Sequence, residues 1–161
     1  MKISILYYTR TGNTRRAAEL VVQGLLRAEK FEVRLMEIDE IDQTFLADSH
    51  TVLFGSPTYS SSFAWPLKRW FDEEARQCNL AGKLAGNFAT GVHIGGGADH
   101  ALTSMAIHEL MRGMLVYSGG GPLTHFGAVL LDVENTVQQE RAIAFGERMG
   151  RKTLELFGTP L

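Results

Sequence analysis

Short apolar runs alternate along this chain with longer segments in which apolar residues recur every three to four positions. The short runs predict buried strands because their apolar residues are continuous or alternate with polar ones. They span residues 3–8, 31–36, 51–54 and 84–90. The third run is followed by Gly55-Ser56-Pro57, which predicts that its strand ends there. A fifth strand is expected in two pieces, 115–117 and 128–131, separated by the glycine-rich stretch 119–122.

The longer segments have the spacing of amphipathic helices. They span residues 15–30, 64–78, 101–114 and 135–157. Glu134 or Asn135 is expected to cap the start of the last helix. The third helix is predicted to place five apolar side chains on one side: Leu102, Met105, Ala106, Leu110 and Met111.

The uninterrupted succession of strand and helix predicts the fold class. It favours an α/β domain spanning residues 1–161, with a parallel sheet and helices on both faces. Ligands of such sheets bind beyond the carboxyl ends of the strands, where the strand order reverses. The loops at those ends, 9–14, 56–62 and 90–97, are also the loops richest in Gly, Ser and Thr. This coincidence points to a ligand site.

The loop between the first strand and the first helix is suited to a phosphate group. It consists of Thr9, Arg10, Thr11, Gly12, Asn13 and Thr14. A helix N-terminus offers free N–H groups and a partial positive charge, and three threonine hydroxyls add further donors. The triphosphate pattern Gly-x-x-x-x-Gly-Lys-Ser/Thr and the dinucleotide pattern Gly-x-Gly-x-x-Gly are both absent. A terminal monophosphate is therefore expected here.

This loop resembles the FMN phosphate signature of flavodoxins, Thr/Ser-x-Thr-Gly-x-Thr, placed between the first strand and the first helix. The resemblance implies FMN as cofactor and a three-layer sandwich whose five-stranded parallel sheet has the order 2-1-3-4-5. Residues 55–62 resemble the loop that flavodoxin-like proteins wrap around one edge of the flavin ring. The flavin contacts that this implies are Pro57, Thr58, Tyr59 and Ser60.

The third loop resembles the WrbA-type branch of the same superfamily, in which Leu-x-Gly-Lys leads into a strand and a glycine-rich loop. Residues 80–97 follow that pattern. The flavin contacts implied are Thr90, Gly91, Val92, His93, Gly95 and Gly96. The resemblance also suggests His93 and His125 as catalytic proton donors to a quinone. It places Arg112 near a substrate pocket, and Trp65 is considered for a flavin or subunit contact.

Two functions fit the resemblance, and a two-electron NAD(P)H:quinone oxidoreductase is favoured. NADPH or NADH would be the donor and a quinone-like small molecule the acceptor. Flavodoxins that carry single electrons tend to be strongly acidic, whereas the formal net charge here is -2. They also often have a glycine in the second loop, and residues 56–62 have none. The alternatives are a flavodoxin-type one-electron carrier, a flavin-binding regulatory protein, and a fold that has lost its flavin.

Composition limits the partners, the location and the metal sites that can be expected. The pI of about 6.2 gives no basic excess for nucleic acid. No apolar run approaches the roughly 18 residues of a membrane helix, so no membrane insertion is expected. Residues 1–4 lead directly into a strand, which predicts a cytoplasmic protein. A single cysteine, Cys78, excludes an intrachain disulfide and a cysteine-built zinc site, and no metal is expected. The WrbA resemblance suggests a homo-oligomer, a dimer or tetramer, whereas flavodoxins are monomers.

Overall fold

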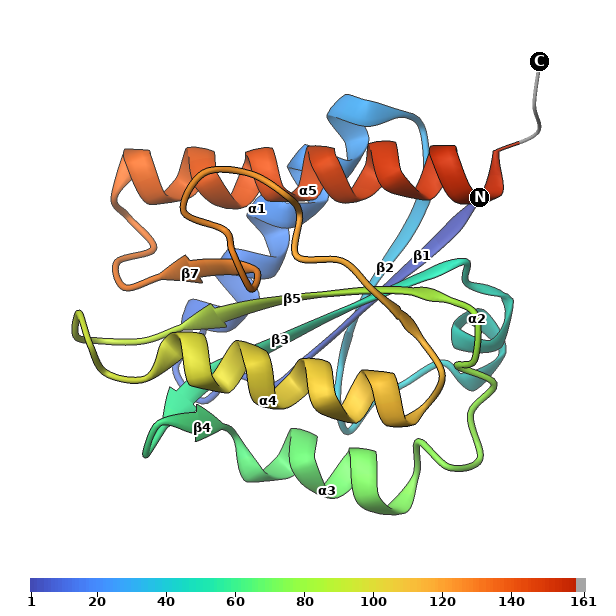
Figure 1. Cartoon of the computed structure of the whole chain (residues 1–161), viewed down its shortest axis with the longest axis horizontal. Helices are drawn as coiled ribbons and strands as arrows, with labels where there is room; N and C mark the ends of the chain where they lie inside the picture. Colours follow the sequence, from blue (N-terminus) through green and yellow to red (C-terminus); the bar gives the residue numbers. More distant parts are fainter. Residues whose placement is uncertain (159–161) are drawn as a thin grey trace.

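A parallel sheet forms the centre of the molecule, with helices on both faces (Figure 1). The structure is a computed structural model that describes residues 1–158, so the last three positions of the predicted domain, 159–161, lie outside the described residues. The sheet has the order β2-β1-β3-β5-β6. These strands are β2 (Glu32–Glu37), β1 (Lys2–Tyr7), β3 (Thr51–Tyr59), β5 (Leu84–Thr90) and β6 (Leu115–Val116). The predicted fold class is confirmed.

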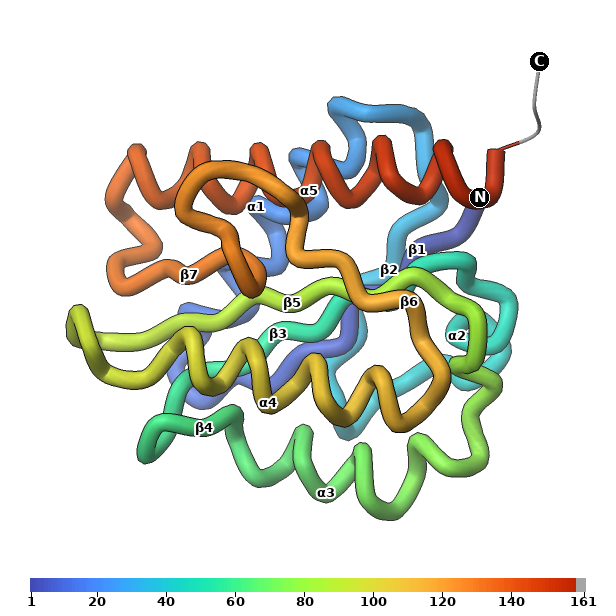
Figure 2. Tube along the Cα trace, in the orientation of Figure 1, coloured from blue at the N-terminus to red at the C-terminus, as the bar shows by residue number. Residues whose placement is uncertain are grey.

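The fifth position of the sheet is shared by two short strands, as the divided pattern predicts. β6 pairs with the start of β5, and β7 (Ala128–Leu130) pairs with its end, both in parallel. Figure 2 shows the segment between them leaving the sheet toward the last helix before it returns. A further short strand, β4 (Ser62–Phe63), pairs antiparallel with the end of β3.

Two helices cover one face of the sheet and three cover the other. The first pair is α1 (Asn13–Ala28) and α5 (Thr136–Phe157); the others are α2 (Gln43–Asp48), α3 (Trp65–Glu73) and α4 (Ala98–Met111). Each face has its own core, because successive strand residues point to opposite sides. Ile5 and Leu53 pack under α1 and α5, whereas Leu6 and Phe54 pack under the other helices.

The α1–α5 contact depends on glycine. A β-carbon added at Gly24 would lie 1.9 Å from the carbonyl oxygen of Ile143, and one added at Gly146 would lie 2.2 Å from that of Val21. Neither position has room for a methyl group, so the two helix backbones approach more closely than larger residues would allow. This contact anchors the first helix, whose N-terminus opens at the carboxyl edge of the sheet.

The structure corrects three details of the predicted elements. β3 does not end before Gly55-Ser56-Pro57 but continues to Tyr59, because the ladder to β5 extends to Pro57 and the last two residues pair with β4. The helix predicted at 101–114 is α4, which buries Leu102, Met105 and Glu109 and leaves Leu110 and Met111 exposed. The short elements α2 and β4 were not predicted. Among residues 1–158, no helix combines the length and apolar character that a membrane span requires.

Candidate functional site

The three predicted loops meet at the carboxyl edge of the sheet and surround a cavity of about 400 Å³. They come together because β1, β3 and β5 are neighbours and run in the same direction. The lining residues are Thr9, Arg10, Thr11, Asn13, Thr14, Pro57, Thr58, Tyr59, Thr90, Gly91 and Val92. All of them are residues that the sequence proposed for a cofactor.

One end of the cavity is formed by the N-terminus of α1, which no side chain caps. Gly12 precedes the helix with a φ of +93°, a left-handed conformation that glycine adopts without strain. The backbone N–H of Gly12 donates to Thr9 Oγ1 at 3.0 Å, which folds the loop onto itself. The first N–H groups of a helix have no intrahelical acceptor. This end is therefore suited to an anion, and Arg10 adds a positive charge to its lining.

A buried pair of hydroxyls connects the loop 9–14, which the sequence predicts to be a phosphate loop, to the third loop. Thr14 Oγ1 and Thr90 Oγ1 lie 2.9 Å apart, and both side chains are almost fully buried. One hydroxyl donates to the other, which leaves a single proton of the pair free for a further acceptor. Thr14 thus holds α1 against β5 as well as lining the cavity, a role that the sequence pattern alone did not indicate.

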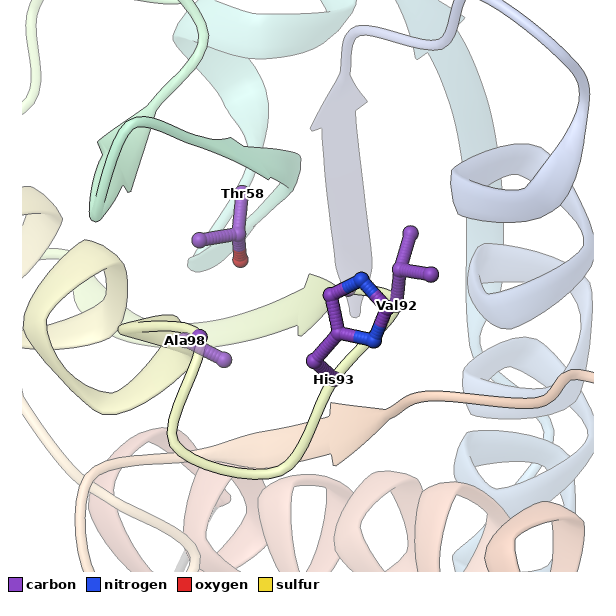
Figure 3. A pocket seen from close by; sticks show the side chains of 6 residues that line it. Thr58, Val92, His93 and Ala98 are labelled. Atoms are coloured by element: carbon purple, nitrogen blue, oxygen red, sulfur yellow. The ribbon is translucent and has the colours of Figure 1, made fainter.

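A smaller cavity of about 180 Å³ continues from the first beneath the third loop. Thr58, Gly91 and Val92 line both cavities, and His93, Gly96 and Ala98 complete the smaller one (Figure 3). Thr58 Oγ1 is buried and has no hydrogen-bond partner among the described residues. A buried polar atom without a partner costs free energy, so this hydroxyl is suited to a polar group of a ligand.

Two exposed side chains border the entrance. Val92 is 78% exposed and Tyr59 is 39% exposed. Burial raises the pKa of Tyr59 above its ordinary value, and the neighbouring Tyr8 adds to the rise. The phenol therefore stays protonated at neutral pH and can donate a hydrogen bond. An apolar side chain and an aromatic ring at one opening suit a flat ligand.

The tip of the second loop is a two-residue turn between β3 and β4. Ser60 and Ser61 have φ values of +48° and +64°, and Tyr59 pairs with Ser62 across the turn. Such turns usually contain Asn or Gly, because a left-handed conformation costs other residues about 1–2 kcal/mol each.

Two residues at the start of α4 support this turn. His100 Nδ1 lies 2.5 Å from the carbonyl oxygen of Ser61, so this nitrogen carries the proton and donates. Gly97, with a φ of +88°, passes so close that an added β-carbon would lie 1.9 Å from Ser61 Oγ. These contacts join the loop 56–62 to the loop 90–97, the two loops predicted to contact the flavin. Neither residue was selected from the sequence, since their role depends on contacts between distant segments.

Several predicted site residues lie elsewhere. Arg112 is at the far end of α4 from the loops, where its guanidinium donates to the carbonyl oxygen of Phe71 at 2.5 Å, so it cannot border this site. His125 is exposed in the segment between β6 and β7 and lines neither cavity. Ser60 forms the turn outside both cavities, and Gly95 lies on the far side of the third loop. Trp65 is 67% exposed and stacks with Arg69.

Comparisons with known proteins match this architecture. The Flavodoxin family model matches residues 5–106. A flavodoxin from Clostridium saccharobutylicum is 42% identical over 98% of this chain and 100% of its own length. A flavodoxin from Aquifex aeolicus is 32% identical over 96% of this chain and 85% of its own.

Solved structures agree on the fold. A flavodoxin, WrbA-like protein from Agrobacterium tumefaciens superposes with a TM-score of 0.82 at 21% identity, covering 96% of this chain and 98% of its own. A Fusobacterium nucleatum flavodoxin bound to flavin mononucleotide superposes with a TM-score of 0.72 at 14% identity, covering 94% and 98%. At these identities the likeness concerns the fold alone.

The prediction of an NAD(P)H:quinone oxidoreductase is wrong. The relatives that are 42% and 32% identical are flavodoxins, whereas an NAD(P)H dehydrogenase (quinone) from Chromohalobacter salexigens is 25% identical over 71% of this chain. The catalytic roles of His93 and His125 and the NADPH or NADH donor depended on that prediction. One of its arguments also fails physically. The second loop reaches positive φ through Ser60 and Ser61, so its lack of glycine does not prevent that backbone conformation.

Proposed function

The chain belongs to the flavodoxin family, and we propose that it binds FMN and carries single electrons between redox proteins. The observation that carries this proposal is the uncapped N-terminus of α1, opening into a cavity that also contains the unpartnered hydroxyl of Thr58. FMN, when bound, can take up and release electrons one at a time. The residues of the chain would bind and orient it and control its surroundings.

The phosphate of FMN would be held by the loop 9–14. The N–H groups at the start of α1 and the hydroxyls of Thr9 and Thr11 supply donors, and Arg10 supplies charge. Because Thr14 and Thr90 are hydrogen-bonded to each other, they would offer one shared donor rather than two. Gly12 would permit the turn without itself lining the cavity.

The flavin ring would occupy the space between the second and third loops. Tyr59 and Val92 stand at its entrance, while Thr58 Oγ1 and the backbone of Gly91, His93 and Gly96 lie deeper. Backbone N–H groups in a partly enclosed site can stabilise negative charge that develops on reduction. Pro57 at the end of the β3–β5 ladder would help to fix the rim.

Electron carriage is favoured by the relatives at 42% and 32% identity, both of which are flavodoxins, and the second loop would give the cofactor fixed surroundings. The turn at Ser60 and Ser61 is held by His100 and by its packing on Gly97. A loop that is fixed on both sides presents its backbone groups to the ring in one arrangement, which pre-organises the surroundings of the cofactor. No side chain at the site is required to transfer a proton or form a bond with a substrate.

A redox titration of the FMN-loaded chain tests the proposal. The protein is saturated with FMN and titrated anaerobically with dithionite, while visible and electron paramagnetic resonance spectra are recorded. We expect two resolved one-electron midpoint potentials and no rapid reduction by NADPH or NADH. A single two-electron step, together with fast reduction by either nucleotide, would contradict electron carriage. Failure to bind FMN would contradict the whole proposal.

A further inference from the structure

A third cavity lies on the opposite side of the third loop from the proposed FMN site. It has a volume of about 690 Å³ and is bounded by residues 93–100, by β7 and by the first turns of α5. In Figure 3 the loop that carries His93 passes over β7 and α5, while Thr58 lies on its other side. A volume of roughly 300–1,000 Å³ is typical of small-molecule sites. We call this space the α5 cavity.

The α5 cavity is separate from the space proposed for FMN. It shares no residue with the cavity formed by the phosphate loop. His93, Gly96 and Ala98 face both the smaller FMN cavity and the α5 cavity, so the third loop forms the wall between them. The phosphate loop and Thr58 do not line the α5 cavity, so FMN held by them would adjoin it only through the third loop.

Two hydrogen-bond donors on α5 face this cavity without partners. Arg141 has neither an ion pair nor a hydrogen bond among the described residues, although it is only partly exposed. Gln138, one helical turn earlier, accepts from the backbone N–H groups of Leu131 and Asp132 at 2.6 and 3.1 Å. Its oxygen is thereby fixed, and its NH₂ group is left unpaired within residues 1–158. Residues three apart on a helix lie on the same face, so the two donors are neighbours.

The capped N–H groups at the start of α5 are not available to bind an anion. Asn135 Oδ1 accepts from the backbone N–H groups of Val137 and Gln138, both at 3.1 Å, so the cap is already satisfied by the chain. Among the lining side chains, the guanidinium of Arg141 carries a permanent positive charge. This group has a planar fork of donors that matches a carboxylate, sulfonate or phosphate.

Part of the cavity wall is apolar and is held in place. Leu123, Val129 and Leu131 line it. Leu123 belongs to the segment between β6 and β7, which Arg148 fastens by donating to Gly119 O at 2.5 Å and to Thr124 Oγ1 at 3.2 Å. Asp99 contributes a carboxylate to the rim, which has no ion pair within residues 1–158 and would repel an anion placed near it. An anion would therefore lie toward Arg141.

We propose that the α5 cavity binds a small organic anion with a flat apolar body. Its charged group lies on Arg141 and Gln138, and its body lies against Leu123, Val129 and Leu131. This site is distinct from the proposed phosphate site, since it uses none of the residues of the phosphate loop, and it shares only the third loop with the proposed flavin site.

Calorimetric titration with naphthalene-1-sulfonate tests the proposal, with neutral 1-naphthalenemethanol as the comparison compound. The full chain is titrated with and without saturating FMN. We expect one sulfonate per chain in both states and at least tenfold weaker binding of the alcohol. Arg141→Gln should weaken sulfonate binding roughly tenfold or more, because hydrogen bonds to a charged group are lost. Arg141→Lys should recover part of it.

Arg151→Gln is the matched control, because Arg151 lies on the same helix but is exposed and paired with Glu147 at 2.5 Å. It should bind the sulfonate like the parent, and thermal unfolding of each variant reports whether it is folded. The proposal is overturned by absence of saturable binding, by equal binding to Arg141→Gln, or by binding that FMN abolishes. Failure of FMN to bind appears separately in the flavin absorbance and leaves the titration of the flavin-free chain interpretable.

Discussion

Replacing Glu109 by glutamine should stabilise the protein at neutral and alkaline pH. Glu109 lies on α4 and is fully buried. The only hydrogen bond of its carboxyl group among the described residues comes from Asn87 Nδ2, which lies 3.2 Å from Oε2, while Oε1 has no partner. Burial raises the pKa of Glu109 from its ordinary 4.5 to about 8, and the bond from Asn87 opposes this rise in part. The carboxyl group is therefore mainly protonated in the native protein at pH 7.

The sign of the effect follows from proton binding. Between pH 4.5 and about 8 the native state keeps a proton that the unfolded state has released. Stability then falls as pH rises, by about 1.4 kcal/mol per pH unit. The loss reaches about 3 kcal/mol at pH 7 and levels off near 5 kcal/mol above pH 9, by the same linkage. Below pH 4.5 both states are protonated, and the loss disappears.

Urea denaturation of the parent and of Glu109→Gln at pH 5, 7 and 9 measures this difference. The glutamine is uncharged and of similar size, so its unfolding free energy should lack this component of the pH dependence. The unfolding free energy of the variant relative to the parent should therefore rise by about 4 kcal/mol between pH 5 and pH 9. Glu73→Gln, which changes an exposed carboxyl on α3, is the control. If the unfolding free energies of the parent and of Glu109→Gln changed equally with pH, the reasoning would be refuted.

Three further predictions concern the phosphate loop, the turn and the helix contact. Thr11→Ala should weaken FMN binding by about 10- to 100-fold in a fluorescence titration, because a hydrogen bond to a charged group is lost. The control Thr44→Ala, at an exposed position, should bind FMN like the parent. An unchanged FMN affinity of Thr11→Ala would remove Thr11 from the proposed phosphate site. Ser61→Gly should raise the free energy of unfolding of the flavin-free chain by roughly 0.5–1 kcal/mol, because glycine adopts the left-handed conformation without strain. The control Ser62→Gly, in the adjoining strand, should lower the free energy of unfolding. A lower free energy of unfolding in both variants would argue against strain in the turn. Gly24→Ala should lower the free energy of unfolding by about 2–3 kcal/mol in urea denaturation, because its methyl group meets the Ile143 carbonyl. Gln23→Ala, at an exposed position on the same helix, is the control. Equal stability of both variants would show that α1 and α5 can move apart at little cost in free energy.

The sequence alone was sufficient for the features that depend on local pattern. The alternation of strand and helix periods predicted a parallel α/β sheet, and the divided fifth strand appeared as β6 and β7. The glycine and threonines of 9–14 stand next to each other in the chain, so the sequence alone could propose them as a phosphate site. Neighbouring parallel strands necessarily bring their carboxyl ends together, so the convergence of the three loops also followed.

Only the tertiary structure decided which distant residues meet. The apolar residues of α4 have no single helical face, and packing against β5 buried Glu109 while it left Met111 exposed. Arg112 could be placed near a pocket by resemblance, but the direction of α4 carries it to the other end of the sheet. The positive φ of Ser60 and Ser61 depends on His100 and Gly97, some 40 residues later. Local periodicity and turn chemistry depend on residues that are close in the sequence. Burial, strain and side-chain pairing depend on contacts that form only when the chain has folded.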